Sequence, residues 1–538
     1  MLVMKFDAGS IGSDDRLRNM ARLVQQSLPR KPVVVTSALP KVTDLLLQGA
    51  HEAKARDGEY EDRLQEVRDA HEKVARGLVV EGPGRRRLLG HIGALIDELR
   101  TYYTAVYSLE ELTPRTLDAV AAIGERLSCE LAVAALVHEG LRAQAVDGRT
   151  LLITDEAFCA ATPLMDETEK RARLHLLPML DTGVVPVVGG FMGATLQGVT
   201  TTLGRGGADG TAAILGAALG AEEIQIWTET AGMTTVDPRI AADAKVIPQV
   251  SPEEAAELAY FGAKVLHPVM IRPALAKGIP VRVLNTEQPA AAGTLVSPQE
   301  NLGPSGPCAV VQRKGITVLL VSQPRMLMAS GFLARVFEVF DRHQTPIDLI
   351  ATSEVSVSVT VDSVEHLPAI KAELAVLGEV RILREMAIVA LVGRGFFRHA
   401  GLARRIFDAL ADVNVVMISF AASDVNVSVW STRPTRSARS TRCTASSSAS
   451  RRPERGARPL PGAGGPCPLS LAPIGLRHRT RSAAGSPHFP ARPLYYRPFI
   501  GFGCGRARWR ATAGGRKGKR SHGTRARASR SGSLRSSP

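Results

Sequence analysis

The chain has 538 residues, of which 45% are hydrophobic, so it is too long for one compact domain and too apolar to be unfolded throughout. Its formal net charge of +15 is unevenly spread, because residues 431–538 hold 24 Lys and Arg against the single acid Glu454. Six cysteines without metal-ligand or disulfide spacing argue against a disulfide scaffold. No apolar run approaches the roughly 18 residues of a membrane span, and no signal peptide is visible. We therefore predict a cytoplasmic protein with no membrane contact.

Residues 2–296 alternate short apolar β-rich runs with helical patterns. Such alternation predicts an α/β fold in which a parallel-rich sheet is sandwiched by helices. A charged stretch at 52–76 with helical period reads as a solvated excursion from the sheet, and the Pro-, Gly- and Ala-rich residues 289–307 read as a linker. The predicted strands are 33–36, 184–188, 224–227 and 279–284, and the predicted helices are 117–144 and 211–219.

An internal repeat follows the linker, because residues 331–359 and 401–429 align without a gap at a constant offset of 70. Each copy predicts a helix, a strand, a turn and a second strand with alternating valines, which is typical of a small α+β module. The first copy continues into an amphipathic helix near 361–374 and a strand at 380–383. The second copy stops at Trp430, so we expect it to lack its final helix and strand.

The last 108 residues (431–538) have no apolar period, and Arg outnumbers Lys by 22 to 2 in them. One interpretation is a natural disordered basic arm that binds polyanions. The other is a reading frame lost near residue 430, since out-of-frame GC-rich codons give Arg, Ala, Gly, Pro and Ser. The junction in the middle of a module favours the lost frame, and both interpretations predict disorder.

The strongest motif is TTTLGRGGADGT at residues 200–211, directly before a predicted helix. Its glycines allow the backbone to approach a ligand, and the helix N-terminus offers unpaired N–H groups to an anion. Arg205 supplies a bidentate fork for a carboxylate or phosphate. The alternative is a plain tight turn between a strand and a helix.

Two isolated charged residues are weaker candidates for functional residues. Lys5 is expected at the end of the first strand and before Gly9, where a lysine can neutralise a phosphoryl group in transfer, although a surface lysine is the alternative. Glu125 is expected early in a helix, where it can hold an ammonium group or simply stabilise the helix start.

Taken together, these segments resemble aspartate kinases of the amino-acid kinase superfamily, in the monofunctional form with paired C-terminal ACT modules. The resemblance covers about residues 1–430, and the combination of motifs is far more specific than any one of them. It is carried by residues 3–6, 33–44, 123–128, 200–209, 223–239, 257–268, 279–286 and 331–359.

The resemblance implies a catalytic domain over 1–298, a ferredoxin-like ACT module over 308–385 and a truncated second module over 386–430, and the composition adds the disordered tail over 431–538. It implies ATP- and Mg²⁺-dependent phosphorylation of the side-chain carboxylate of L-aspartate, the first step towards lysine, threonine and methionine. A homodimer through the ACT modules, lysine as feedback effector and no nucleic-acid partner are expected with it.

Roles follow from the resemblance by motif. Lys5 would stabilise the transferring phosphoryl group and Asp209 would orient Lys5. The substrate positions would be Thr43, Glu125, Phe191, Arg205, Gly206, Gly207 and Ala208. The nucleotide positions would be Lys5, Gly9, Ser10, Thr228, Glu229, Arg239, Lys264 and Val265, with Mg²⁺ carried by ATP. The effector positions would be Met326, Phe332, Leu333, Asp348, Ser353 and Glu354, although Phe332 and Leu333 also fit a plain core.

The chain departs from the family in its first loop, where Asp7 and Ala8 replace two glycines. A carboxylate there repels phosphate, and Ala8 would resist a positive φ, so we expect impaired turnover. Two alternatives remain at this stage. One is another amino-acid kinase that forms an acyl phosphate. The other is a silent subunit that binds an effector and regulates a partner.

Overall fold

The computed structural model describes residues 1–431 except 262–265, 267–269, 298–305, 324–329, 399, 412 and 421–422. The basic tail from residue 432 onward, Lys264, Val265 and Met326 therefore lie outside the described residues. Among the described helices, none is both long and apolar enough to cross a lipid bilayer.

An eight-stranded sheet forms the first part of the chain, in the order β3-β4-β2-β1-β7-β9-β10-β8. All neighbouring strands are parallel except the antiparallel pair β9 and β10. The four predicted strands are present, whereas β10 lies inside the stretch predicted as a linker. The strands are β1 (Leu2–Phe6), β2 (Pro32–Thr36), β3 (Ala143–Val146), β4 (Val185–Gly189), β7 (Glu223–Thr228), β8 (Gln249–Val250), β9 (Val281–Asn285) and β10 (Thr294–Val296), and a separate hairpin joins β5 (Met192–Ala194) to β6 (Thr200–Thr202).

Helices cover both faces of this sheet, because alternate residues of each strand point to opposite sides. Leu2, Met4 and Phe6 enter one core, and Val3 enters the other. This arrangement confirms the predicted fold class. The first core is closed by α1 (Asp14–Gln26), α2 (Val42–Lys54), α3 (Tyr60–Leu78), α4 (Pro83–Leu109) and α5 (Pro114–His138), and the second by α7 (Met165–Asp181), α8 (Gly207–Leu219), α9 (Pro252–Tyr260) and α10 (Arg272–Ala276), with the short α6 (Gly148–Leu151) contributing Leu151.

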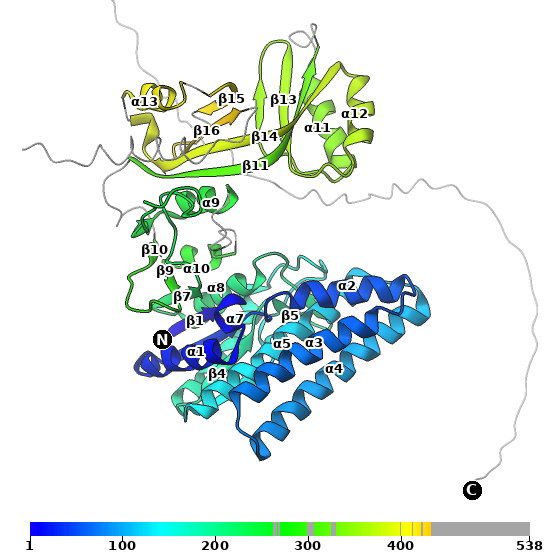
Figure 1. Cartoon of the computed structure of the whole chain (residues 1–538), viewed down its shortest axis with the longest axis vertical. Helices are drawn as coiled ribbons and strands as arrows, with labels where there is room; N and C mark the ends of the chain where they lie inside the picture. Colours follow the sequence, from blue (N-terminus) through cyan, green and yellow to red (C-terminus); the bar gives the residue numbers. More distant parts are fainter. Residues whose placement is uncertain are drawn as a thin grey trace, which may run out of the picture. The chain divides into compact units, whose positions relative to one another are not determined.

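Two helix predictions need correction. The stretch 52–76 is not a solvated excursion, because α3 buries Leu64, Val67 and Val74 in the first core. Figure 1 shows α3 and α4 as long neighbouring helices beside α5. The helix predicted to run to residue 144 ends at His138, since Gly140 adopts a φ of +82° and the chain turns into β3.

The repeated region forms one six-stranded antiparallel sheet in the order β12-β13-β11-β14-β16-β15. Figure 1 shows β11 and β14 as two long strands side by side. The elements are β11 (Gly306–Ser322), α11 (Phe332–Arg342), β12 (Ile350–Thr352), β13 (Ser356–Val361), α12 (Leu367–Ala375), β14 (Glu379–Arg394), the 3₁₀ helix η5 (Phe396–Arg398), α13 (Leu402–Ala409), β15 (Val415–Phe420) and β16 (Asn426–Ser431).

The two long strands are shared between the modules. Residues 318–322 of β11 and 379–383 of β14 pair in the first module, and residues 306–316 and 386–394 pair in the second. The second module therefore has its fourth strand after all, supplied by β11 from before the first module. The prediction that it lacks a strand is wrong, and what its repeat lacks among the described residues is the helix corresponding to α12.

Candidate active site

Lys5 and the glycine-rich loop after β6 converge at the carboxyl edge of the sheet. Lys5 lies near the end of β1 and points to the same side as Val3, where α8 packs, and Asp209 lies in the first turn of α8. The Lys5 Nζ lies 2.8 Å from the Asp209 Oδ1, and both side chains are less than a tenth exposed. The spatial proximity expected of these two residues is thus observed.

The charge of Lys5 is stabilised by its surroundings. Burial alone would lower the pKa of the Lys5 ammonium, but the carboxylates of Asp209, Asp7 and Glu125 outweigh it and raise the pKa above its ordinary value. Lys5 therefore stays protonated at neutral pH. Because the N-terminus of α8 adds unpaired N–H groups beside it, the site attracts anions.

The loop before α8 needs its glycines. Gly204 and Gly206 adopt φ values of +75° and +77°, and Gly206 is the N-cap of α8. A Cβ on Gly207 would lie 2.7 Å from the ring of Phe191, so the loop and this ring are closely matched. Phe191 is itself held at a φ of +67°, and its N–H donates to the Thr211 Oγ1 over 3.0 Å.

A cavity of about 250 Å³ opens between these elements. It brings together both predicted catalytic residues and every predicted substrate residue. One lining residue, Ser37, was missed by the sequence analysis, although it directly follows β2 at the edge where parallel strands present their ligand-binding ends. The cavity is lined by Lys5, Ser37, Thr43, Glu125, Phe191, Gly204, Arg205, Gly206, Gly207, Ala208 and Asp209.

Glu125 is a buried carboxyl at the wall of this cavity. It lies in the middle of α5, not near its start as predicted, because that helix begins at Pro114 after the Thr113 cap. Burial raises its pKa to about 8, against a hydrogen bond from the Ala38 N–H and the charge of Lys5. Its Oε2 has no hydrogen-bond partner among the described residues. A buried carboxyl oxygen in this state is suited to an ammonium group brought by a ligand.

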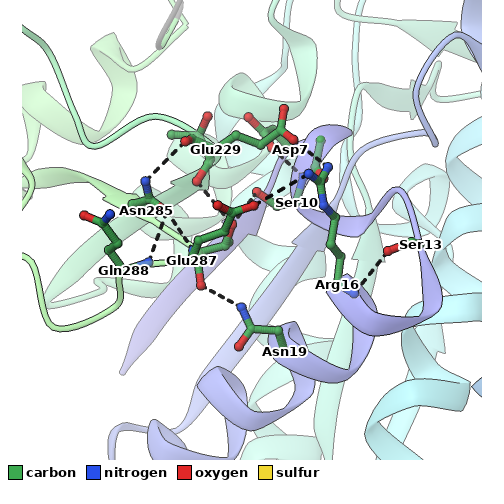
Figure 2. A network of polar contacts seen from close by, with 12 residues as sticks. Asp7, Ser10, Ser13, Arg16, Asn19, Glu229, Asn285, Glu287 and Gln288 are labelled. Carbon is green, nitrogen blue, oxygen red and sulfur yellow. Dashed lines mark hydrogen bonds and ion pairs between the residues drawn. The ribbon is translucent and has the colours of Figure 1, made fainter.

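The loop that follows β1 is folded by its own carboxylate (Figure 2). The Asp7 carboxylate accepts a hydrogen bond from the Ser10 N–H over 3.0 Å, and the Ser10 hydroxyl donates to the Trp227 carbonyl over 3.1 Å. Ala8, which precedes the 3₁₀ helix η1 (Gly9–Ile11), has a φ of −53°. The predicted backbone strain at Ala8 is therefore wrong, since its conformation suits any L-residue. Asp7 remains the significant departure.

Arg16 of α1 joins three loops beside η1, as Figure 2 shows. Its guanidinium donates to the Gly9 carbonyl over 2.5 Å and pairs with Glu229 over 2.5 Å and with Glu287 over 3.7 Å. The Glu229 carboxylate packs so closely on Gly9 that a Cβ there would clash with it. Sequence reasoning identified Gly9 and Glu229 but missed Arg16 and Glu287, which carry no motif of their own.

The remaining predicted nucleotide residues are less closely joined to this loop. Thr228 ends β7, and its carbonyl accepts the Thr286 N–H over 3.0 Å. The side chain of Arg239 is 87% exposed and pairs with Asp237 over 2.7 Å. Lys264 and Val265 lie outside the described residues.

The predicted effector residues separate into two groups. Phe332 is buried in the core of the first module, as its alternative interpretation held, whereas Leu333 is 37% exposed. Ser353 and Glu354 lie exposed in the turn between β12 and β13. Burial and the nearby Asp362 raise the pKa of Asp348, against a hydrogen bond from the Tyr260 hydroxyl of α9. Met326 lies outside the described residues.

The site combines a buried lysine–carboxylate pair, a glycine-rich turn before a helix and the edge of a largely parallel sheet. Residues 1–285 match the family model described as "Amino acid kinase family", which gives the class of protein. Residues 389–430 match the model described as "ACT domain". Aspartokinase 3, chloroplastic, of Arabidopsis thaliana is 35% identical over 443 residues, 79% of this chain and 78% of the relative. Lysine-sensitive aspartokinase 3 of Escherichia coli (strain K12) is 34% identical over 437 residues, 79% of this chain and 94% of the relative.

Solved structures agree with these relatives. E. coli aspartokinase III in complex with aspartate and ADP (R-state) is 33% identical, with a TM-score of 0.70 over 82% of this chain and 98% of that chain. The same enzyme in complex with lysine and aspartate (T-state) gives a TM-score of 0.71 over 84% and 99%. The chain therefore belongs to the aspartokinases, a kinase group within the amino acid kinase family.

Proposed function

We propose that this chain transfers the γ-phosphoryl group of ATP to the side-chain carboxylate of L-aspartate, giving 4-phospho-L-aspartate and ADP. The observation that carries the proposal is the single cavity that joins Lys5, Asp209, Glu125 and Arg205. A small substrate with two carboxylates and one ammonium group finds an opposite charge for each of them there.

Each charged residue of the cavity is proposed to bind a different group of the substrate. The exposed Arg205 binds the α-carboxylate, and Glu125 accepts the ammonium group with the Oε2 that has no partner among the described residues. Lys5, held by Asp209, faces the bond that changes and cancels charge as the phosphoryl group moves. The substrate carboxylate is already a nucleophile, so the protein positions two anions and needs no general base.

ATP is proposed to bind on the side of η1, between Asp7, Gly9 and the residues after β7. The Glu229 carboxylate packs against Gly9 of that loop, and an oxygen ligand of this kind fits a Mg²⁺ ion carried mainly by the triphosphate. When bound, Mg²⁺ would neutralise charge on the phosphate oxygens. Asp7 occupies the Ser10 N–H with its own oxygen, and we propose that it weakens ATP binding.

The ACT modules are proposed to bind lysine as a feedback effector and to join two chains in a homodimer. Two contacts between the first module and α9 support this proposal. Asp348 interacts with the Tyr260 hydroxyl, and the Arg313 guanidinium lies 5.2 Å from the centre of the Tyr260 ring. An ammonium group that binds Asp348 would compete with Tyr260 for its carboxylate. Such competition would couple the effector to α9 in the first part of the chain.

The test is hydroxylamine trapping of the acyl phosphate, run beside a coupled ADP-release assay with MgATP. We expect a hydroxamate with L-aspartate and none with L-asparagine, which lacks the accepting carboxylate. Absence of hydroxamate above the Lys5→Met background at millimolar L-aspartate contradicts the proposal. Calorimetric binding of lysine by the same inactive sample, without ATP or aspartate binding, would then identify a silent regulatory subunit.

A further inference from the structure

Asp118 is a buried carboxylate near the start of α5 that the proposed chemistry does not use. It is only 1% exposed. Its Oδ1 accepts a hydrogen bond from the Thr202 hydroxyl over 2.6 Å, and its Oδ2 accepts the Thr202 N–H over 3.0 Å and the Cys159 N–H over 2.9 Å. A carboxylate removed from water is costly unless it is hydrogen-bonded, so these three donors stabilise Asp118 in its place.

The three donors belong to two segments that meet at the glycine-rich loop. Thr202 is the last residue of β6 and lies two positions before Gly204. Cys159 lies in the segment 155–162, and its carbonyl oxygen would be 3.0 Å from a Cβ on Gly204. Asp118 therefore holds both segments that fix the start of the loop carrying Arg205.

The backbone of the segment 155–162 depends on contacts of this kind. Cys159 has a φ of +69°, a left-handed conformation that is unfavourable for a residue with a side chain. Such a conformation persists where the surrounding structure fixes it. The hydrogen bond from the Cys159 N–H to Asp118 is one contact that does so, and it ties the segment to α5.

The helix α5 also carries Glu125, seven residues after Asp118. Residues at this spacing share one face of a helix. Glu125 lines the cavity directly, while Asp118 holds the strand end that leads to Arg205. One face of one helix therefore positions both groups that are proposed to bind the α-carbon substituents of L-aspartate.

The far end of the glycine-rich loop has contacts of its own. Asp209 pairs with Lys5 over 2.8 Å, and the Thr211 hydroxyl accepts the Phe191 N–H over 3.0 Å. Loss of the Asp118 contacts should therefore displace Arg205 more than the pair of Lys5 and Asp209.

We propose that Asp118 is a positioning residue for L-aspartate, which sets the place of Arg205 relative to Glu125. It acts through Thr202 and Cys159, whereas Arg205 and Glu125 contact the substrate. The inference rests on the proposed function, which assigns Arg205 to the α-carboxylate and Glu125 to the ammonium group. It extends that function by placing a determinant of substrate affinity outside the residues that line the cavity.

The kinetic test compares Asp118→Ala with Asp118→Asn in the full-length chain, by hydroxamate formation and coupled ADP release. Asp118→Ala removes three hydrogen bonds to a charged group, so the KM for L-aspartate should rise at least about tenfold. Since the far end of the loop keeps its contacts, kcat and the KM for ATP should change less than about threefold. A fall in kcat with an unchanged KM for L-aspartate, or no change in either, overturns the proposal.

The Asn variant tests whether the hydrogen bonds carry the effect. Its carbonyl can accept both backbone N–H groups while its amide donates to the Thr202 hydroxyl, so all three contacts can be kept. The KM for L-aspartate should stay within about threefold of the parent value. An Asn variant as impaired as Asp118→Ala overturns the positioning role.

Asp155→Ala is the matched control within the same segment. The Asp155 Oδ1 accepts the N–H groups of Ala157 over 3.2 Å and Thr162 over 2.9 Å, both inside the segment. Its loss should change the KM for L-aspartate by less than about threefold. An effect equal to that of Asp118→Ala would mean that the stability of the segment, and not its link to α5, controls binding, which overturns the proposal.

Hydrogen exchange followed by mass spectrometry tests the anchoring without catalysis. In Asp118→Ala, peptides covering residues 155–164 and 196–206 should exchange faster than in the parent, with no change in peptides of α8 beyond Thr211. Unchanged exchange in the first two regions, or equally faster exchange in all three, overturns the anchoring. A parent that forms no hydroxamate overturns the proposed function and this role with it, whereas an active parent whose KM survives Asp118→Ala overturns this role alone.

Discussion

The two halves of the proposed active site hold their charges in different ways. In the aspartate half Arg205 is exposed, but Lys5, Asp209 and Glu125 are all less than a tenth exposed, and one ion pair of 2.8 Å joins the first two of these three. In the ATP half, the side chains of Arg16, Glu229 and Glu287 are 39%, 49% and 66% exposed. Buried charges interact strongly and are costly to leave unpaired, whereas exposed pairs are screened by water.

This difference in burial indicates which half of the site tolerates amino-acid substitutions. Each charge of the aspartate half is matched to a neighbour or to a group that the substrate would bring. The ATP half contains the unusual Asp7, whose carboxylate accepts from the Ser10 N–H without backbone strain at Ala8. Substitutions should therefore have larger effects in the aspartate half than in the ATP half.

The largest effect is expected for Lys5→Met. Loss of the ammonium removes the charge that faces the transferring phosphoryl group, so kcat should fall roughly 10³-fold in the coupled ADP-release assay. It also breaks the buried ion pair between Lys5 and Asp209, at a cost of about 3–5 kcal/mol in the free energy of unfolding. Thermal unfolding measured beside the assay separates the two effects.

The matched control is the double variant Lys5→Met/Asp209→Asn, in which both charges of the buried ion pair are removed. Its Tm should recover towards that of the parent while kcat stays low. Recovery of activity in the double variant would show that Lys5 acts only in folding, and the assignment of the aspartate half would then be wrong.

The next effect is expected for Glu125→Gln. Because the proposed ammonium ligand is lost, the KM for L-aspartate should rise on the order of 10²-fold, with a smaller change in the KM for ATP. In the parent, the KM for L-aspartate should fall as the pH rises from 6.5 towards 8.5, because the pKa of Glu125 is raised to about 8 and the ionised form binds the ammonium group. The variant should lose that pH dependence.

Stability gives an independent measurement on the same variant. The carboxyl of Glu125 ionises near its ordinary pKa of 4.5 in the unfolded chain and near 8 in the folded one. Its contribution to stability is therefore complete below pH 4.5 and is lost as the pH rises to 8. Glu125→Gln should raise the Tm at pH 8 and change it little at pH 4.5. A lower Tm at pH 8 would contradict burial of an unsatisfied carboxyl.

A smaller effect, of opposite sign, is expected for Asp7 in the ATP half. Asp7→Gly removes a carboxylate that would repel the phosphates, so kcat/KM for ATP should rise about 10- to 100-fold. Asp7→Asn keeps the oxygen that accepts from Ser10 but removes the charge, and it separates the two contributions. Ala8→Gly should have little effect, because Ala8 has an ordinary helical φ. No gain in either Asp7 variant would mean that this loop does not limit ATP use.

The fold could be predicted where a single strand or turn has a recognisable local sequence pattern, such as an apolar run or a cluster of glycines. The buried runs of β2 and β7 and the glycine turn at 204–207 identified the sheet and the start of α8, which placed Lys5 and Asp209 together. The depth of Glu125 was missed, since the start of α5 depends on the Thr113 hydroxyl accepting the Thr116 N–H.

Long-range pairing was not predictable from local patterns. The fourth strand of the second module comes from β11, which precedes the first module in sequence. The Arg16 network likewise joins a helix near the N-terminus to residues more than two hundred positions away. Neither contact leaves a periodic trace in the sequence, because each depends on how distant segments meet at the sheet edge.

The smallest effect is expected for Arg16→Gln, which removes the exposed pairs with Glu229 and Glu287. Exposed pairs of this kind contribute about 0–1 kcal/mol, so the free energy of unfolding by urea should change by less than about 1 kcal/mol. Because the guanidinium also holds the Gly9 carbonyl, the KM for ATP should rise about two- to fivefold with the KM for L-aspartate unchanged. Arg18→Gln, on the same helix, is the matched control, since Arg18 donates to Gly77 and Leu78 away from the loop. If Arg16→Gln lowered activity and stability as much as Lys5→Met, the difference in exposure would not explain how the two halves respond to substitution. The charges beside Gly9 would then be as tightly coupled as those around Asp209.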